Sequence, residues 1–70
     1  MTEELKDGKL TKFTVASGEF EAEILEDNGT PYVFIDCISE FDVEHVEQIA
    51  VRLLALVDTI KSNQPIEVQP

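Results

Sequence analysis

Positive charge is missing from the middle of this 70-residue chain. Between Phe13 and Val51 there is no Lys or Arg, whereas ten Asp and Glu residues lie there. The two ends are electrically balanced, so the whole formal net charge of -10 comes from this block. Negative charge on this scale repels itself and opposes a compact chain. It also disfavours direct binding to nucleic acid or to an anionic membrane, since both attract cationic proteins.

Cysteine is nearly absent as well. Cys37 is the only one, so no disulfide can form within the chain, and a lone thiol favours a reducing cytoplasm over secretion. The first ten residues contain no apolar signal core, and no stretch approaches the length of a membrane span. We therefore expect a cytoplasmic protein.

The remaining composition is typical of a globular domain. Hydrophobic residues make up 43% and charged residues 29% of the sequence, which is too apolar for a disordered acidic tail. With only three glycines and three prolines, no linker or low-complexity segment divides the chain. We predict a single domain over residues 1–70, near the lower size limit for one hydrophobic core. Additional burial in a homodimer or a complex would stabilise such a domain.

Three segments with alternating polar and apolar residues predict β-strands. They cover about 10–16, 19–26 and 31–38. Ser17-Gly18 separates the first two, and Asn28-Gly29, the strongest short-range hairpin sequence, precedes the third. Pro31 stands at the first position of the third strand, where a missing N–H is tolerated. The pattern predicts a three-stranded antiparallel meander.

The two predicted hairpins agree on one apolar face. If each turn is a two-residue loop, Val15 lies opposite Phe20, and Phe20 lies opposite Cys37. A slip of one residue in either hairpin would scatter the apolar side chains over both faces. The predicted core face comprises Phe13, Val15, Phe20, Ala22, Ile24, Val33, Ile35 and Cys37.

A helix is predicted over about 42–62. Asp42 can cap its first turn, and Phe41 with Val46 has the spacing of a hydrophobic staple. The predicted stripe that covers the sheet consists of Val46, Ile49, Ala50, Leu53, Leu56, Val57 and Ile60. Residues 63–70 are predicted to be a tail, with a short fourth strand at 66–68 as the alternative. The predicted fold class is α+β, three antiparallel strands packed on one C-terminal helix.

The sheet face turned away from the helix is predicted to be acidic. Glutamates at alternate positions of the second strand project at intervals of about 6.6 Å, close to the ~7 Å of two steps of ~3.4 Å along one strand of B-DNA. Glu21 falls opposite Asp36, and like charges directly opposite each other destabilise a strand pair. Large apolar side chains of the third strand lie beside them, and contiguous exposed apolar surface tends to mark an interface. The predicted partner-binding residues are Glu19, Glu21, Glu23, Asp36, Tyr32 and Phe34.

Two other interpretations of these features remain open. Glutamates on a solvated sheet face also keep a protein soluble and discourage edge-to-edge aggregation. Val43, Val51 and Leu54 lie off the main helical stripe, so the surplus apolar surface also fits a homodimer formed through the helix. The third strand is a second candidate for such a dimer contact. In a small homodimeric structural or interaction domain, the acidity would serve solubility.

Residues with catalytic or metal-binding chemistry are few. His45 is the only histidine; with Asp42 and Glu44 it could hold a cation, but a surface or capping role is favoured. Cys37 is predicted on the core face, where a thiol is normally inert. Glu21 and Asp36 are paired like an acid/base dyad, but an open sheet face offers no cleft that excludes water. We expect no enzymatic activity, no cofactor and no metal.

The leading hypothesis is therefore a non-enzymatic binding protein. Its acidic face would dock on a basic surface of a protein partner, such as a nucleic-acid-binding effector or enzyme, and would exclude nucleic acid from that surface. In size, acidity and element order the chain resembles small phage-encoded inhibitors, among them anti-CRISPR proteins and DNA-mimic inhibitors of repair or restriction enzymes. The resemblance involves no residue motif, so it assigns no functional residue. If a phage encodes the chain, the expected location is the cytoplasm of the host.

Overall fold

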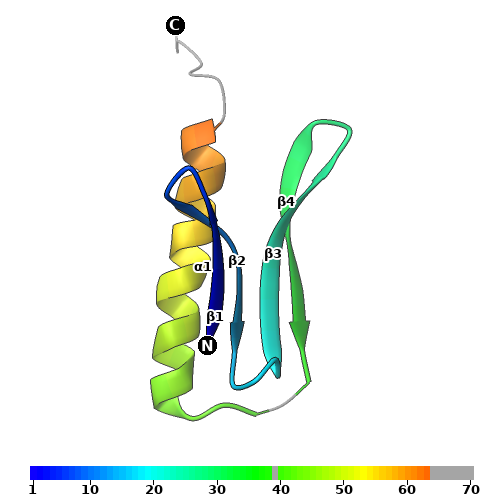
Figure 1. The fold of residues 1–70 in the computed structure, drawn as a ribbon. Helices are drawn as coiled ribbons and strands as arrows, with labels where there is room; N and C mark the ends of the chain where they lie inside the picture. The colour runs from blue at the N-terminus through cyan, green and yellow to red at the C-terminus, as the bar shows by residue number, and fades with distance from the viewer. Residues whose placement is uncertain (39, 64–70) are drawn as a thin grey trace, which may run out of the picture.

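The structure, a computed structural model, describes residues 1–38 and 40–63. Within these residues it contains four strands, β1 (Thr2–Lys6), β2 (Lys9–Val15), β3 (Phe20–Asp27) and β4 (Thr30–Cys37), and then the helix α1 (Val43–Asn63). The strands form one antiparallel sheet in the order β1-β2-β3-β4, with α1 on one face (Figure 1). The predicted α+β class is confirmed. The predicted short strand at 66–68 lies outside the described residues.

The N-terminal strand β1 was not predicted, because the predicted sheet begins only at about residue 10. Asp7 and Gly8 join β1 to β2 with φ angles of 54° and 78°, the left-handed conformation that the tightest hairpin loops use. All five residues of β1 are exposed. An edge strand that is exposed along its whole length lacks the alternation by which half-buried strands are found. A bulge in the pairing with β2 follows Glu4.

The strand register agrees with the prediction. Val15 pairs with Phe20, and Phe20 pairs with Cys37, as two-residue loops require. The amide of Glu19 donates a hydrogen bond of 3.2 Å to the carbonyl of Ala16, which closes the loop between β2 and β3. Both loops contain residues with positive φ. Turn chemistry therefore fixes which side chains share a face of the sheet.

The hydrophobic core lies between α1 and the strands β2 and β3. Phe13, Val15 and Leu56 are its largest fully buried side chains. The ring of Phe20 stacks on that of Phe13 with 5.7 Å between centroids. The ring of Phe41 contacts the Phe20 ring edge-on, with 6.0 Å between centroids. These aromatic contacts hold the segment that precedes α1 against the sheet. The buried apolar residues are Leu10, Phe13, Val15, Phe20, Ala22, Ile49 and Leu56.

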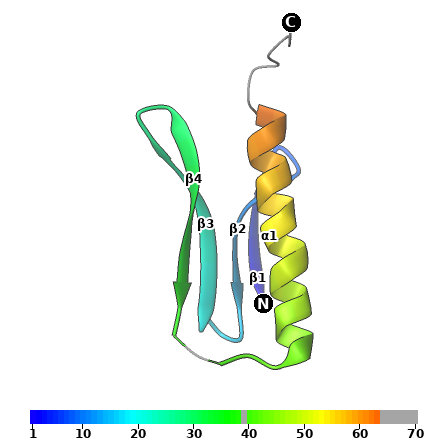
Figure 2. The same cartoon turned by 180° about the vertical axis from the view of Figure 1, so that it is seen from behind.

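The inner side of β4 lies mostly outside this core, and only Val33 packs against it. Ile35 is 50% exposed and Cys37 is exposed, so the prediction that both are core residues is wrong. Ile24 and Val33 are only partly buried. Figures 1 and 2 show the reason, because α1 runs beside β1 and β2 while β4 lies at the far side of the sheet. Burial therefore does not protect the thiol of Cys37.

The helix is also turned about its axis relative to the predicted stripe. Ile49 and Leu56 are buried as predicted, but Val46, Ala50 and Val57 are exposed. Ala55, Arg52 and Thr59 lie on the sheet side of α1 in their place. Arg52 and Thr59 are polar, so hydrophobic periodicity cannot place them there.

Two polar residues connect α1 to the sheet. The hydroxyl of Thr59, which is 3% exposed, donates a hydrogen bond of 2.7 Å to the carbonyl of Leu10 in β2. The Nε atom of Arg52 lies 3.3 Å from an Oε atom of Glu3 in β1. Because Glu3 belongs to the strand that was not predicted, the missing strand also explains why the helix orientation was wrong.

Asp42 caps the helix as predicted. Its Oδ1 accepts a hydrogen bond of 2.9 Å from the amide of His45 and lies 2.8 Å from Nδ1 of the same residue. The amide hydrogen bond, followed by the side-chain hydrogen bond and the charge of His45, lowers the pKa of the Asp42 carboxyl below its ordinary value. In this structure His45 contributes to the start of the helix.

Candidate functional site

The sheet face opposite α1 is open and carries the acidic residues of β3 and β4. We call it the outer face. Since side chains of antiparallel partners point to the same side, the strand register defines its members. They are Thr2, Glu4, Lys12, Thr14, Glu21, Glu23, Leu25, Tyr32, Phe34 and Asp36.

A first cross-strand row on the outer face brings two carboxylates together. Thr14 of β2 pairs with Glu21 of β3, and Glu21 pairs with Asp36 of β4. The predicted opposition of Glu21 and Asp36 is therefore present. Like charges at directly opposite positions repel each other and weaken the strand pair, so this row does not optimise the stability of the sheet.

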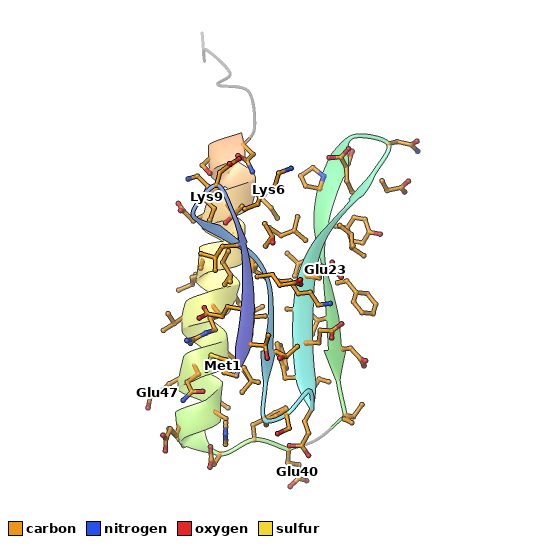
Figure 3. The ribbon with its side chains drawn as sticks, viewed as in Figure 1. Met1, Lys6, Lys9, Glu23, Glu40 and Glu47 are labelled. Carbon is orange, nitrogen blue, oxygen red and sulfur yellow. The ribbon has the colours of Figure 1, made fainter. Side chains whose placement is uncertain are left out.

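A second row places one cation among carboxylates. Lys12 of β2 pairs with Glu4 of β1 on one side and with Glu23 of β3 on the other, and Glu23 in turn pairs with Phe34. The Nζ atom of Lys12 lies 4.0 Å from an Oε atom of Glu4. Figure 3 shows Glu23 on β3, in the middle of the sheet. The N-terminal strand therefore adds both a carboxylate and an ion pair to the outer face.

Aromatic side chains form the β4 edge of the outer face. Tyr32 and Phe34 are each 45% exposed and follow each other on the same side of β4. Leu25 of β3 lies opposite Tyr32. Ile38, just beyond β4, is 77% exposed. Large apolar surface next to carboxylates is the combination from which protein interfaces with a dry centre and a charged rim are built.

Five of the six predicted site residues share the outer face. Glu21, Glu23, Tyr32, Phe34 and Asp36 lie on β3 and β4 as the predicted register requires. They therefore form a contiguous group of carboxylates and aromatic rings.

The sixth predicted residue, Glu19, lies in the turn before β3 and not in the strand, whose first residue is Phe20. It is exposed, and its carbonyl accepts a hydrogen bond of 3.2 Å from the amide of Ile38. Of the three glutamates predicted on one strand, Glu21 and Glu23 therefore lie in β3, and Glu19 lies in the turn before it.

Sequence reasoning missed Glu4, because the strand that carries it was missed. The pattern that could have revealed it is Asp7-Gly8, which is a hairpin dipeptide of the same kind as Asn28-Gly29. With β1 in place, Glu4 pairs with Lys12 and occupies the β1 end of the outer face.

Among residues 1–38 and 40–63, no group of three or more His, Cys, Asp or Glu side chains could hold a metal ion. In that part of the chain no helix is both long and apolar enough to cross a membrane. Comparison with protein-family models, curated proteins and solved structures gives no match. The chemical feature that stands out is the outer face.

Proposed function

We propose that this chain is a non-enzymatic binding protein that docks its outer face on a basic surface of a protein partner and excludes nucleic acid from that surface. The observation that carries the proposal is the opposition of Glu21 and Asp36 beside two half-exposed rings. Both features are unfavourable in an isolated sheet, since the charges repel and the rings meet water. A cationic partner that covers this face reverses both effects.

The proposed mode of binding is electrostatic at long range and contact-driven at short range. The net charge of -10 steers the chain towards a basic groove. On contact, Arg side chains of the partner pair with the carboxylates of Glu21, Glu23 and Asp36. The rings of Tyr32 and Phe34 offer faces on which guanidinium groups stack. Nucleic acid needs the same cationic groups, so the two ligands compete for one surface.

The alternative is a solvated outer face whose acidity serves solubility alone. Glutamates on an open sheet face have this effect in many proteins. The two interpretations differ in whether the position of the negative charge matters. Solubility depends on the amount of negative charge, whereas docking depends on the charge of the outer face in particular.

The first experiment uses this difference. Partners are captured from a bacterial lysate on the immobilised chain, and a purified partner is then titrated against variants. Glu21→Gln with Asp36→Asn should weaken binding at least about tenfold, which corresponds to ~1.4 kcal/mol. The matched control, Glu44→Gln with Glu47→Gln, removes the same charge from exposed positions of α1 and should leave the affinity within about twofold, a change of ~0.4 kcal/mol.

A second experiment tests the competition with nucleic acid. Double-stranded DNA added to the purified complex should release the chain, and higher salt should weaken the complex, because exposed charge pairs are screened. The proposal is overturned if the Glu21/Asp36 double variant binds as tightly as the original chain. It is also overturned if the partner holds DNA and this chain at the same time.

A further inference from the structure

The solvent side of α1 carries a second apolar stripe. Its members are Val43, Val46, Ala50, Leu54 and Val57, all exposed, and the exposed fractions of the four larger ones range from 40% at Val57 to 74% at Val43. Spacings of three and four residues are typical of a helix that packs against another helix. A surface helix normally has one apolar stripe and a polar opposite side. The helix α1 therefore has one stripe more than its own sheet covers.

This stripe borders the uncovered part of the sheet. On one side of α1, Val51 lines a hollow together with residues of β1. On the other side, Ile60 lines a hollow with Ile24 of β3 and Pro31 of β4. Val57 comes three residues before Ile60, so at about 100° per residue the two side chains are only about 60° apart around the helix axis. The stripe thus faces solvent on the β4 side, where the sheet has no helix of its own above it.

The stripe is symmetric about Ala50. The intervals from Val43 to Val57 are three, four, four and three residues, which read the same in both directions. A two-fold axis at Ala50 consequently places an antiparallel copy of the stripe in register with itself, as an isologous contact requires. Val43 then faces Val57 of the second copy, and Val46 faces its Leu54. The small side chain of Ala50 permits close approach where the helices cross.

The charges in the first and last turns of α1 favour the same antiparallel orientation. Glu44 lies in the first turn of α1 and Lys61 in the last. In an antiparallel pair, Lys61 of one helix lies near the acidic start of the other, and opposite ends of the two helix dipoles are adjacent. In a parallel pair, ends of like charge would be adjacent.

We propose that two copies of this chain associate through this stripe as an antiparallel homodimer with its two-fold axis at Ala50. The stripe spans the part of α1 from Val43 to Val57, so the contact is about 22 Å long and ~10 Å wide. It covers on the order of 200 Å² on each copy, below the ~800 Å² of a standard interface. The dimer is therefore weak and forms as the protein concentration rises. The dimer contact lies on α1, on the opposite side of the sheet from the outer face. The dimer proposal therefore does not depend on the proposed function.

Sedimentation velocity from low micromolar to near-millimolar protein tests the association. The original chain should shift from monomer to dimer over this range. Leu54→Glu puts charge into the stripe of both copies and should give a monomer at every concentration. Val51→Glu is the matched control, since Val51 is 65% exposed against 70% for Leu54 but lies off the stripe; it should dimerise like the original chain. Circular dichroism verifies that both variants are folded.

Disulfide trapping tests the position of the axis. In a Cys37→Ser background, Ala50→Cys should form a disulfide-linked dimer on mild oxidation, because the two positions meet at the axis. Leu54→Cys should not, because antiparallel packing separates its two copies by about 12 Å along the helices, beyond the ~7 Å limit for a disulfide. A monomer at all concentrations, a Leu54→Glu variant that still dimerises, or equal cross-linking of both cysteine variants would each overturn the proposal.

Discussion

Strands β2 and β4 have similar alternating sequences, but β2 lies in the core whereas β4 only borders it through Val33. Phe13 and Val15 of β2 are at most 1% exposed, whereas Ile35 on the same face of β4 is 50% exposed. The helix α1 covers β2 and leaves β4 uncovered (Figures 1 and 2). Alternation therefore specifies which side chains share a face, and the position of the helix decides which of them become buried. The apolar side chains of β4 consequently remain accessible to other molecules.

Truncations in the two strands should differ most in stability. Phe13→Ala should lower the free energy of unfolding by roughly 3–5 kcal/mol, because it leaves a cavity in the core. Ile35→Ala should lower it by less than about 1.5 kcal/mol, because half of that side chain is already in water. Urea unfolding followed by circular dichroism measures both. If Phe13→Ala does not fold, Phe13→Leu takes its place. Equal losses in the two strands would contradict the difference in burial.

The polar link between α1 and β2 should have the next largest effect. Thr59→Val removes the hydroxyl that donates to the Leu10 carbonyl at 2.7 Å and should lower stability by about 1 kcal/mol. Thr11→Val is the control, since its hydroxyl donates to the Glu4 carbonyl at 3.1 Å at an exposed position. The same urea titration should show a smaller loss for this control. A Thr59→Val protein as stable as the original would show that this bond does not anchor the helix.

Removal of charge from the β3–β4 pair should act in the opposite direction. Glu21→Gln with Asp36→Asn should raise the free energy of unfolding by about 0.2–1 kcal/mol, because it relieves cross-strand repulsion. The gain should shrink at high salt, which screens exposed charges. Glu44→Gln with Glu47→Gln should give no gain, since negative charge is favourable near a helix N-terminus. Thermal unfolding at two salt concentrations measures both; a gain in the helix variant alone would contradict this view of the outer face.

The smallest expected effect is the pH dependence of the helix cap. The folded state lowers the pKa of Asp42, so its carboxylate stabilises the fold above about pH 4, and this contribution is lost as the pH falls through the folded pKa. Asp42→Asn keeps a good cap at neutral pH but does not titrate. The melting temperature of the original chain should therefore fall more steeply below about pH 4 than that of the variant. Parallel curves would contradict the assignment.

The part of the fold that could be predicted is the part fixed by local chemistry. Two-residue loops at Ser17-Gly18 and Asn28-Gly29 determine the pairing of three strands, and this pairing places Glu21 opposite Asp36. Asp42 is recognisable as a cap from its position and residue type. These features depend on a few neighbouring residues, so a single sequence is enough to find them.

The rest depends on a strand with almost no hydrophobic pattern. Leu5 is the only apolar residue in β1. Because all five residues of this edge strand are exposed, no alternation of apolar residues indicates a side that faces the core. Without β1, nothing indicates that Arg52 lies over the sheet beside Glu3, or that Glu4 joins the outer face. The alternating sequence of β4 also gives no indication that α1 covers β2 and not β4. The missing strand thus left the Arg52–Glu3 contact and the position of Glu4 unpredicted.

The hairpin connectivity of the sheet also has a kinetic consequence. Every strand pairs with its neighbour in sequence, so the sheet can form in local steps, each of about 1–10 μs. The contact between α1 and β2, whose Thr59–Leu10 bond spans 49 residues, closes the longest loop and should limit the folding rate. Stopped-flow refolding of Thr59→Val tests this, since slower folding is expected and an unchanged rate would contradict it. The strands that carry the outer face would then be paired before the core is closed.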